Sequence, residues 1–336
     1  MSRKKIALAL QGGGSHGAYT WGVLDRLLED GRIEIEGISG ASAGAMNAVV
    51  LAHGYTAGGR DGAREALNRF WGSVSEKLGH NGIAAASAVP VPDPTARAYL
   101  FLTRFFSPYQ LNPLNINPLR DIVAEQVDFE RLRSECTMKL FVSATRVSNG
   151  ALRIFSREEL TVDALLASAC LPSIHHTVEV EGAAYWDGGL TANPPLSVLL
   201  YKCTARDLLV VVLNPLGSDE VPSTPDAIAE RLSQIGFSST LSAELQAIAM
   251  AKAEALRARF ALGRLDRRLR GLNIHLIDSA QYMAGLAPAS RYNTDSGFIE
   301  ALRDEGRSRA AEWLGRNFKA IGMRTTVSLD SPLLQS

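Results

Sequence analysis

The chain has 336 residues, 46% of them hydrophobic, and its 35 basic and 35 acidic side chains give a formal net charge of zero. This length leaves room for one large domain or two modest ones with a sizeable core. The neutral balance argues against a nucleic-acid-binding protein, and an odd number of scattered cysteines indicates free thiols in a reducing compartment. Only Ile6–Leu10 separate the first basic residues from a glycine-rich stretch, so we expect no export signal and a cytoplasmic protein.

The first strand pattern, Lys5–Leu10, is followed by the glycine-rich stretch Gly12–Gly17 and a helical pattern over Ala18–Leu28. Bare backbone N–H groups in such a stretch can hold an anion, as an oxyanion loop requires. The stretch also satisfies the pattern G-x-G-x-x-G, with Glu34 or Glu36 near the spacing of a ribose-binding acid. A Rossmann-type dinucleotide-binding enzyme is therefore an alternative, although both acids fall early in their strand pattern.

A serine-centred turn comes next, with the sequence Gly-Ala-Ser-Ala-Gly at residues 40–44. It lies between an alternating strand pattern, Arg32–Ser39, and a small apolar helix, Ala45–His53. A turn of this kind lifts a serine hydroxyl to a helix N-terminus, where free N–H groups favour a developing negative charge. Ser42 is therefore the candidate nucleophile, although the pattern alone also fits a helix cap in a buried βα unit.

The helical pattern Arg64–Lys77 leads into an irregular, proline-rich stretch over 79–118, which contains an apolar and aromatic run at 98–106. A loop this long is uncommon unless it is functional or disordered. One interpretation is a lid or acyl-chain entrance in which Phe101 and Phe105 contact substrate. The other is a helix packed on the core.

Strand patterns return at 139–147, 152–155 and 178–186, and the last of these leads into the sequence Tyr-Trp-Asp-Gly-Gly-Leu at residues 185–190. An Asp before two glycines is often only a turn. A nucleophilic serine needs a base within hydrogen-bond reach, however, and Asp187 on a glycine turn can approach it closely. Desolvation in a site closed to water would raise the pKa of Asp187 and improve its proton transfer.

Further strand patterns follow at 208–213 and 272–277. Two helices, or one long kinked helix, are predicted over 226–259, with Gly236 as the expected break, and an amphipathic helix is predicted over 295–318. The arginines between positions 257 and 270 fit a solvated helix end, and they also fit a patch that faces anionic lipid.

Three motifs in this order resemble the patatin-like phospholipase family. The stretch 12–17 resembles the family's oxyanion loop, residues 40–44 its serine elbow and residues 187–189 its aspartate turn, and residues 167–172 are also similar. The resemblance spans about residues 5–215 and implies a Ser42–Asp187 dyad that cleaves fatty-acyl esters of lipids without a metal or other cofactor. The oxyanion hole that it implies comprises Gly12, Gly13, Gly14 and Ala43.

One departure concerns His16, because the family usually has Arg or Lys at this position. It motivates a third hypothesis, a non-catalytic acyl-binding or scaffolding protein. The order Ser42, Asp187, His275 would also suit a hydrolase triad, but His275 falls inside a strand pattern, whereas a triad histidine usually lies on a loop. No His, Cys, Asp or Glu spacing predicts a metal site.

The sequence thus predicts an α/β fold, a patatin-like three-layer sandwich with a mostly parallel central sheet between helices and the site at the carboxyl ends of the strands. We expect one hydrolase domain over 1–336, a lid-like insertion at 79–118 and a helical C-terminal extension at 216–336. The expected function is a serine acyl-ester hydrolase. Its expected partners are lipid or other acyl-ester substrates and, transiently, a membrane surface.

Overall fold

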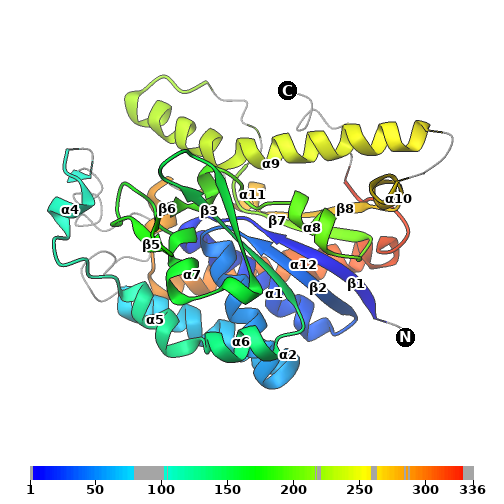
Figure 1. The fold of residues 1–336 in the computed structure, drawn as a ribbon, viewed down its shortest axis with the longest axis horizontal. Coiled ribbons are helices and arrows are strands. Elements are labelled where there is room, and N and C mark those ends of the chain that lie inside the picture. Colours follow the sequence, from blue (N-terminus) through cyan, green and yellow to red (C-terminus); the bar gives the residue numbers. More distant parts are fainter. Residues whose placement is uncertain are drawn as a thin grey trace.

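The computed structural model describes residues 3–78, 102–103, 105–215, 217, 221–258, 263–283, 285–286 and 288–327. Its centre is an eight-stranded sheet in the order β5-β6-β3-β2-β1-β7-β8, with β4 paired to β3 (Figure 1). The strands are β1 (Lys4–Leu10), β2 (Ile33–Gly40), β3 (Lys139–Arg146), β4 (Leu152–Ser156), β5 (Val178–Val180), β6 (Ala183–Asp187), β7 (Asp207–Val212) and β8 (Asn273–Asp278).

Strands β3, β2, β1, β7 and β8 run parallel, whereas β4, β5 and β6 make antiparallel pairs at one side of the sheet. Parallel strands are covered on both faces, so they read as continuous apolar runs. Ile6–Leu10 and Leu208–Val212 are such runs, and every side chain in them is buried. The carboxyl ends of the parallel strands meet at one edge of the sheet, where ligands bind in folds of this kind.

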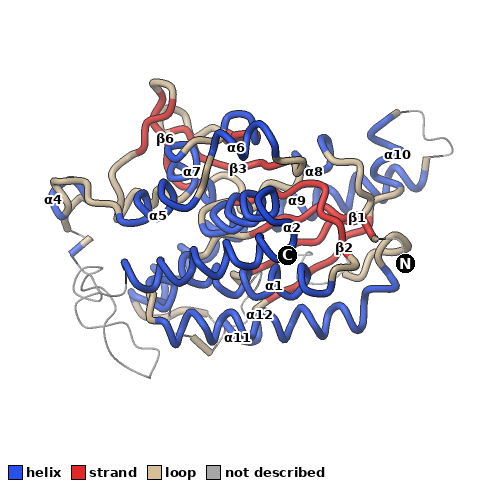
Figure 2. Tube along the Cα trace, turned by 90° about the horizontal axis from the view of Figure 1, so that it is seen from below, coloured by secondary structure: helices blue, strands red, loops and turns tan. Residues whose placement is uncertain are grey.

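Helices cover both faces of the sheet (Figure 2). The α-helices are α1 (Gly17–Asp30), α2 (Ala43–Leu78), α4 (Pro108–Leu111), α5 (Pro118–Gln126), α6 (Phe129–Glu135), α7 (Val162–Ser168), α8 (Ser197–Lys202), α9 (Pro225–Arg257), α10 (Arg264–Arg270), α11 (Ala280–Met283) and α12 (Ser296–Asn317). The short 3₁₀ turns are η1 (Gly14–His16), η3 (Arg157–Glu159), η4 (Gly188–Leu190), η5 (Pro288–Tyr292) and η6 (Phe318–Ala320).

The side chains of β1 point alternately into two separate parts of the hydrophobic core. Ile6, Leu8 and Leu10 belong to the cluster that also contains buried side chains of α1, α2 and α12. Ala7 and Ala9 belong to a second cluster with α8, α9 and α10. Successive strand residues point to opposite faces, so the two clusters are the two sides of the sheet. The predicted three-layer α/β architecture is confirmed.

One detail of the prediction is wrong, and one alternative is decided. The expected single strand over 178–186 is a hairpin, because Glu181 and Gly182 adopt φ values of 51° and 75° and turn the chain between β5 and β6. Of the two alternatives over 226–259, the single long helix is found, and α9 continues through Gly236. An isolated glycine costs a helix about 1 kcal/mol but keeps its N–H in the hydrogen-bond ladder.

The predicted helix over Arg64–Lys77 is the second half of α2, whose path changes at the non-helical residues Gly58 and Gly59. The expected insertion at 79–118 lies in part outside the described residues, and Phe101 lies among those outside. From 105 onward the segment is described. Its Phe105 side chain is 68% exposed, so it does not pack into the core.

The C-terminal part contributes to the sheet as well as to the helical layers, because β8 pairs with β7 and α12 packs against α1. Residues 318–326, here called the C-terminal clasp, lie at the amino end of the strands. The carboxylate of Asp207 accepts the N–H of Gly322 at 2.7 Å, and Lys4 donates to the carbonyl of Ile321 at 2.7 Å.

Candidate functional site

Ser42 occupies the turn between β2, which ends at Gly40, and α2, which begins at Ala43. Its φ of 51° lies in the left-handed region, which is strained for a residue with a side chain and recurs at functional sites. The residues around this turn must be small, because other parts of the backbone pack directly against it. A Cβ on Gly44 would lie 2.1 Å from the carbonyl oxygen of Leu10. The half-buried Ser42 thus stands at the carboxyl end of the central strands.

The glycine-rich stretch Gly12–Gly17, here called the glycine loop, follows β1 at the same edge of the sheet. A Cβ on Gly12 would lie 2.8 Å from the Cβ of Ser42, so the loop lies directly against the serine turn. The N–H of Gly12 donates to Oδ1 of Asn193 at 2.7 Å. The N–H groups of Gly13, Gly14 and Ala43 make no hydrogen bond to another described residue. Three donors near Ser42 therefore remain available to an anion, and Gly12 contributes its close backbone approach.

Asp187 ends β6 and lies directly before the turn η4. The N–H of Gly189 donates to its Oδ1 at 2.7 Å. Oδ2 is buried and has no partner of good hydrogen-bond geometry among the described residues. The backbone around it is fixed, because the N–H of Asp187 donates to the carbonyl of Cys170 at 2.8 Å and its carbonyl accepts from Thr145 at 2.8 Å.

Burial raises the pKa of Asp187 to about 7, while the N–H of Gly189 and the hydroxyl of Ser42 act in the opposite direction. The effect of Ser42 means that its hydroxyl lies within interaction range of the carboxylate. A carboxyl group with a pKa near neutrality can both accept and return a proton. The structure therefore brings together Ser42, Asp187 and the glycine loop, from segments far apart in the sequence.

Two supporting residues were not predicted as site residues. The hydroxyl of Ser168, at the end of α7, accepts the N–H of Ser42 at 3.0 Å. Asn193 holds Gly12 and donates to the carbonyl of Phe237 on α9 at 3.0 Å. Ser168 lies inside the family-like stretch 167–172, and Asn193 shortly follows the aspartate turn. In the sequence, only their closeness to the stretch 167–172 and to the aspartate turn could have indicated that these two residues belong to the site.

His16 belongs to the glycine loop and contacts the turn η5. Its Nε2 is 2.8 Å from the hydroxyl of Ser290 on η5. Burial, together with the positive charge of Arg291, lowers the pKa of His16 to about 3. A Cβ on Gly14 would lie 2.4 Å from the carbonyl oxygen of Arg291, so η5 packs closely on the loop. The imidazole is therefore a neutral hydrogen-bonding group near pH 7.

The two alternative sites are not assembled. His275 is buried on β8, where its Nε2 lies 3.0 Å from Asp207 and its Nδ1 lies 2.8 Å from Thr326 of the clasp. It is thus committed to a structural network rather than to Ser42. Glu36 accepts from Lys139 at 2.8 Å and from the N–H of Ala205 at 2.7 Å, so it is not available to a ribose. Glu34 pairs with Lys5 at 3.6 Å near the start of β2, at the opposite end of the strands from Gly12–Gly17.

Within the described ranges, no group of three or more His, Cys, Asp and Glu side chains is arranged to hold a metal ion. Among the helices of those same ranges, none combines the length and the apolar character that a bilayer crossing needs. Cys136, Cys170 and Cys203 are all buried free thiols, as predicted.

Comparison with known proteins gives one family. The family model described as patatin-like phospholipase matches residues 8–200, which is more than half of the chain and includes all three motifs. No curated protein sequence matches. The solved structure of VipD from Legionella pneumophila is similar at a TM-score of 0.46 and 16% identity, over 94% of this chain and 67% of that chain. A chain of the heterodimeric ExoU–SpcU complex of the Pseudomonas aeruginosa type III secretion system is similar at a TM-score of 0.33 and 17% identity. This match covers 99% of this chain and 74% of that chain.

Proposed function

Because this chain belongs to the patatin-like phospholipase family, we propose that it is a lipid acyl hydrolase in which Ser42 and Asp187 act as a catalytic dyad. The observation that carries the proposal is the fully buried carboxyl of Asp187, whose Oδ2 has no other described partner and whose pKa responds to the Ser42 hydroxyl. A buried carboxylate without a counter-ion is costly, and such groups cluster at functional sites.

In the first step, the ionised carboxylate of Asp187 accepts the hydroxyl proton of Ser42 while Oγ attacks the ester carbonyl carbon. The carbonyl oxygen becomes an oxyanion, which the N–H groups of Gly13, Gly14 and Ala43 stabilise. These donors are fixed by the backbone, so they need no reorganisation when the charge develops. As the carbon–oxygen bond to the alcohol breaks, protonated Asp187 returns its proton to the leaving alkoxide. An acyl-Ser42 ester remains.

In the second step, Asp187 accepts a proton from water, and the hydroxide attacks the acyl-Ser42 carbonyl. The same N–H groups stabilise the second oxyanion, and as it collapses the bond to Oγ breaks, protonated Asp187 returns its proton to Oγ of Ser42, and a fatty acid is released. One carboxyl group therefore serves as base and acid in turn, which requires a pKa near the working pH. The value of about 7 for Asp187 meets that requirement.

We also propose transient contact with a lipid surface. The segment around α4 carries large apolar side chains that are 39% to 80% exposed. They are Leu102, Phe105, Phe106, Tyr109, Leu114 and Ile116. Clusters of this kind are rare on soluble surfaces without an apolar partner. On α9, the exposed residues Ile228, Leu232 and Ile235 follow helical spacing and share one face.

The proposal is tested with a fluorophosphonate probe and with p-nitrophenyl butyrate. The native protein should be labelled and should hydrolyse the ester, and Ser42→Ala should lose both properties with an unchanged melting temperature. Ser39→Ala, a matched change of a buried serine near the end of β2, the strand that leads to Ser42, should keep both. Undiminished labelling of Ser42→Ala would place the nucleophile elsewhere and reject the dyad.

A further inference from the structure

Phe237 on α9 packs directly against the aspartate turn. A Cβ on Gly189 would lie 2.5 Å from Cε1 of the Phe237 ring and 3.0 Å from Oδ1 of Asp187. Gly189 is also the residue whose N–H donates to that Oδ1. The ring therefore lies against the piece of backbone that the Asp187 carboxyl group contacts, and a residue with a side chain would not fit between them.

The position of this ring is fixed relative to both catalytic segments. Asn193 donates to the carbonyl of Phe237 at 3.0 Å and accepts the N–H of Gly12 at 2.7 Å. Asn193 is fully buried, so this link between α9 and the glycine loop is shielded from water. In addition, a Cβ on Gly188 would lie 2.1 Å from the carbonyl oxygen of Ser143 on β3. The aspartate turn is therefore in contact with β3 through one glycine and with α9 through the next.

Phe237 lies where α9 enters the core. Leu241, Leu245 and Ile248, which follow it along the helix, belong to the second of the two core clusters. Among the described side chains of α9, none before Ser238 is buried. Figure 1 shows these first turns of the helix on the side of the molecule where β6 lies. The half-buried ring of Phe237 therefore stands between solvent and the aspartate turn.

The carboxyl group of Asp187 depends on such a cover. Burial raises its pKa to about 7, whereas the N–H of Gly189 and the hydroxyl of Ser42 lower it, and no charged side chain of the described residues is among the causes. The nearby thiol of Cys170 has its pKa raised to about 12, chiefly by burial, so it stays neutral near pH 7. Water that reached the carboxylate would stabilise the charged form and lower the pKa of Asp187.

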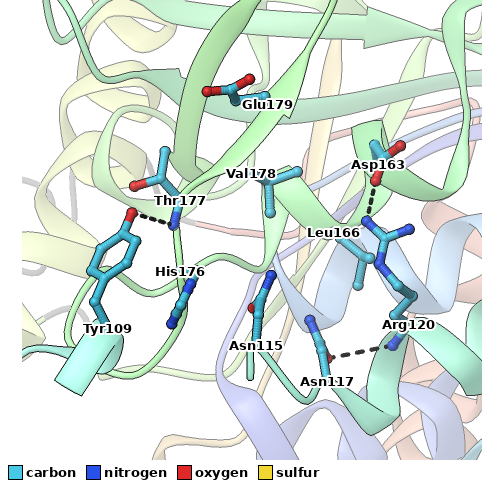
Figure 3. Close-up of a pocket in the computed structure, with 10 residues that line it drawn as sticks. All are labelled: Tyr109, Asn115, Asn117, Arg120, Asp163, Leu166, His176, Thr177, Val178 and Glu179. Atoms are coloured by element: carbon cyan, nitrogen blue, oxygen red, sulfur yellow. Dashed lines mark hydrogen bonds and ion pairs between the residues drawn. The ribbon is translucent and has the colours of Figure 1, made fainter. Parts of the chain in front are cut away.

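Another aromatic contact supports the main chain of β6. The rings of Tyr109 and His176, whose centroids are 4.1 Å apart, border a pocket of about 370 Å³ between α4, α5, α7 and β5 (Figure 3). The carbonyl of His176 accepts from the thiol of Cys170 at 3.1 Å, and the carbonyl of Cys170 accepts the N–H of Asp187 at 2.8 Å. This connection reaches Asp187 through its backbone, whereas the Phe237 ring meets the turn beside the carboxyl group.

We infer that Phe237 is a positioning residue of the proposed dyad, an inference that rests on the proposed function. Its ring holds the aspartate turn against β3 and excludes water from the carboxyl group of Asp187. Phe237→Ala removes the ring, and Phe237→Leu keeps part of the apolar cover. Phe318→Ala is the matched control, because this half-buried ring lies over Lys4 and Arg32 at the amino edge of the sheet.

The first readout is kcat/KM for p-nitrophenyl butyrate between pH 5 and 9. In Phe237→Ala, the inflection near pH 7 should move about one unit lower or more, because water would stabilise the ionised carboxylate of Asp187. Above the inflection, kcat and kcat/KM should fall together by about tenfold, as expected when a general base becomes weaker and less well placed. Phe237→Leu should shift the inflection in the same direction by less, and Phe318→Ala should not shift it.

The second readout does not depend on turnover. Because the folded pKa of Asp187 lies above the unfolded value of 3.8, this group should lower the folding equilibrium constant about tenfold per pH unit between the two values. A lower folded pKa narrows that interval. In denaturant unfolding, the folding equilibrium constant of Phe237→Ala should therefore fall about tenfold less between pH 4 and 8 than that of the native protein. Phe318→Ala should lose stability by a similar factor at both pH values.

An unshifted inflection or an unchanged pH dependence of folding in Phe237→Ala would overturn the inference, as would an equal shift in Phe318→Ala. If Phe237→Ala does not fold, an inflection of Phe237→Leu at the native pH is the result that overturns it. If the native protein cleaves p-nitrophenyl butyrate and the inflection stays in place, only this inference fails. If the native protein cleaves no ester, the proposed function fails, and the unfolding data alone show whether Phe237 shields Asp187.

Discussion

At the scale of single residues, Asp187 combines an uncommon burial with an uncommon pKa. Its carboxyl group is fully buried, and desolvation moves its pKa from about 3.8 in an unfolded chain to about 7. The protonated form is therefore favoured by folding. The stability that depends on this group is fully present below pH 3.8 and is lost as pH rises through 7.

We predict that Asp187→Asn stabilises the fold while it inactivates the enzyme. Because the native charge is disfavoured by about three pKa units, the variant should gain up to roughly 4 kcal/mol in unfolding free energy at pH 8 and almost nothing near pH 4. Turnover should fall about a hundred- to ten-thousandfold. Denaturant unfolding at both pH values measures the first effect. The control Asp61→Asn, whose side chain is 97% exposed, should change neither quantity. A less stable variant at pH 8 would contradict the assignment.

The pH dependence of turnover provides a second prediction at this scale. Asp187 must be ionised to accept the Ser42 proton, so kcat/KM for a soluble ester should rise with pH and level off above an inflection near 7. His16, with a pKa of about 3, should add no inflection between pH 5 and 9. His16→Gln keeps a neutral partner for Ser290 and should leave the profile unchanged. A shifted inflection in this variant would mean that His16 titrates.

At the scale of elements, the segment around α4 presents its apolar side chains outward, at the end of the molecule where the central parallel strands finish (Figure 1). We predict that Phe105→Ser with Phe106→Ser reduces hydrolysis of micellar lipid several-fold, because less apolar surface would be buried on contact with the aggregate. Hydrolysis of p-nitrophenyl butyrate should not change. The control Met323→Ser removes a side chain that is 80% exposed at the opposite edge of the sheet. Equal losses on both substrates, with a lower melting temperature, would mean that the two rings support the fold.

At the scale of the whole molecule, the C-terminal clasp ties the amino edge of the sheet together through His275, Asp207 and Thr326. We predict that His275→Ala lowers the unfolding free energy by a few kcal/mol, since it leaves a cavity and breaks both hydrogen bonds. Turnover measured well below the melting temperature should remain near the native value. A large loss of kcat with an intact fold would instead give His275 a role in catalysis.

The part of the fold that local periodicity encodes was predictable from the sequence. The opening βαβα pattern, the serine turn and the aspartate turn each extend over a few consecutive residues, and their elements are found where expected. Long-range contacts have no such local signature. Asn193 holds Gly12 across 181 positions, and nothing in either segment specifies the other. The hairpin at Glu181–Gly182 was missed because its alternating apolar pattern continues through the turn.

The position of the clasp has a practical consequence. A hydrogen bond of 2.9 Å joins Lys4, at the start of β1, to the carbonyl of Phe318, at the end of α12. The start of β1 and the end of α12 therefore both lie at the amino edge of the sheet. Ser42 and Asp187 lie towards the opposite edge. An affinity handle or a surface linker attached beyond either of these segments would therefore orient each immobilised molecule with its reactive face outward, accessible to vesicles or films of substrate.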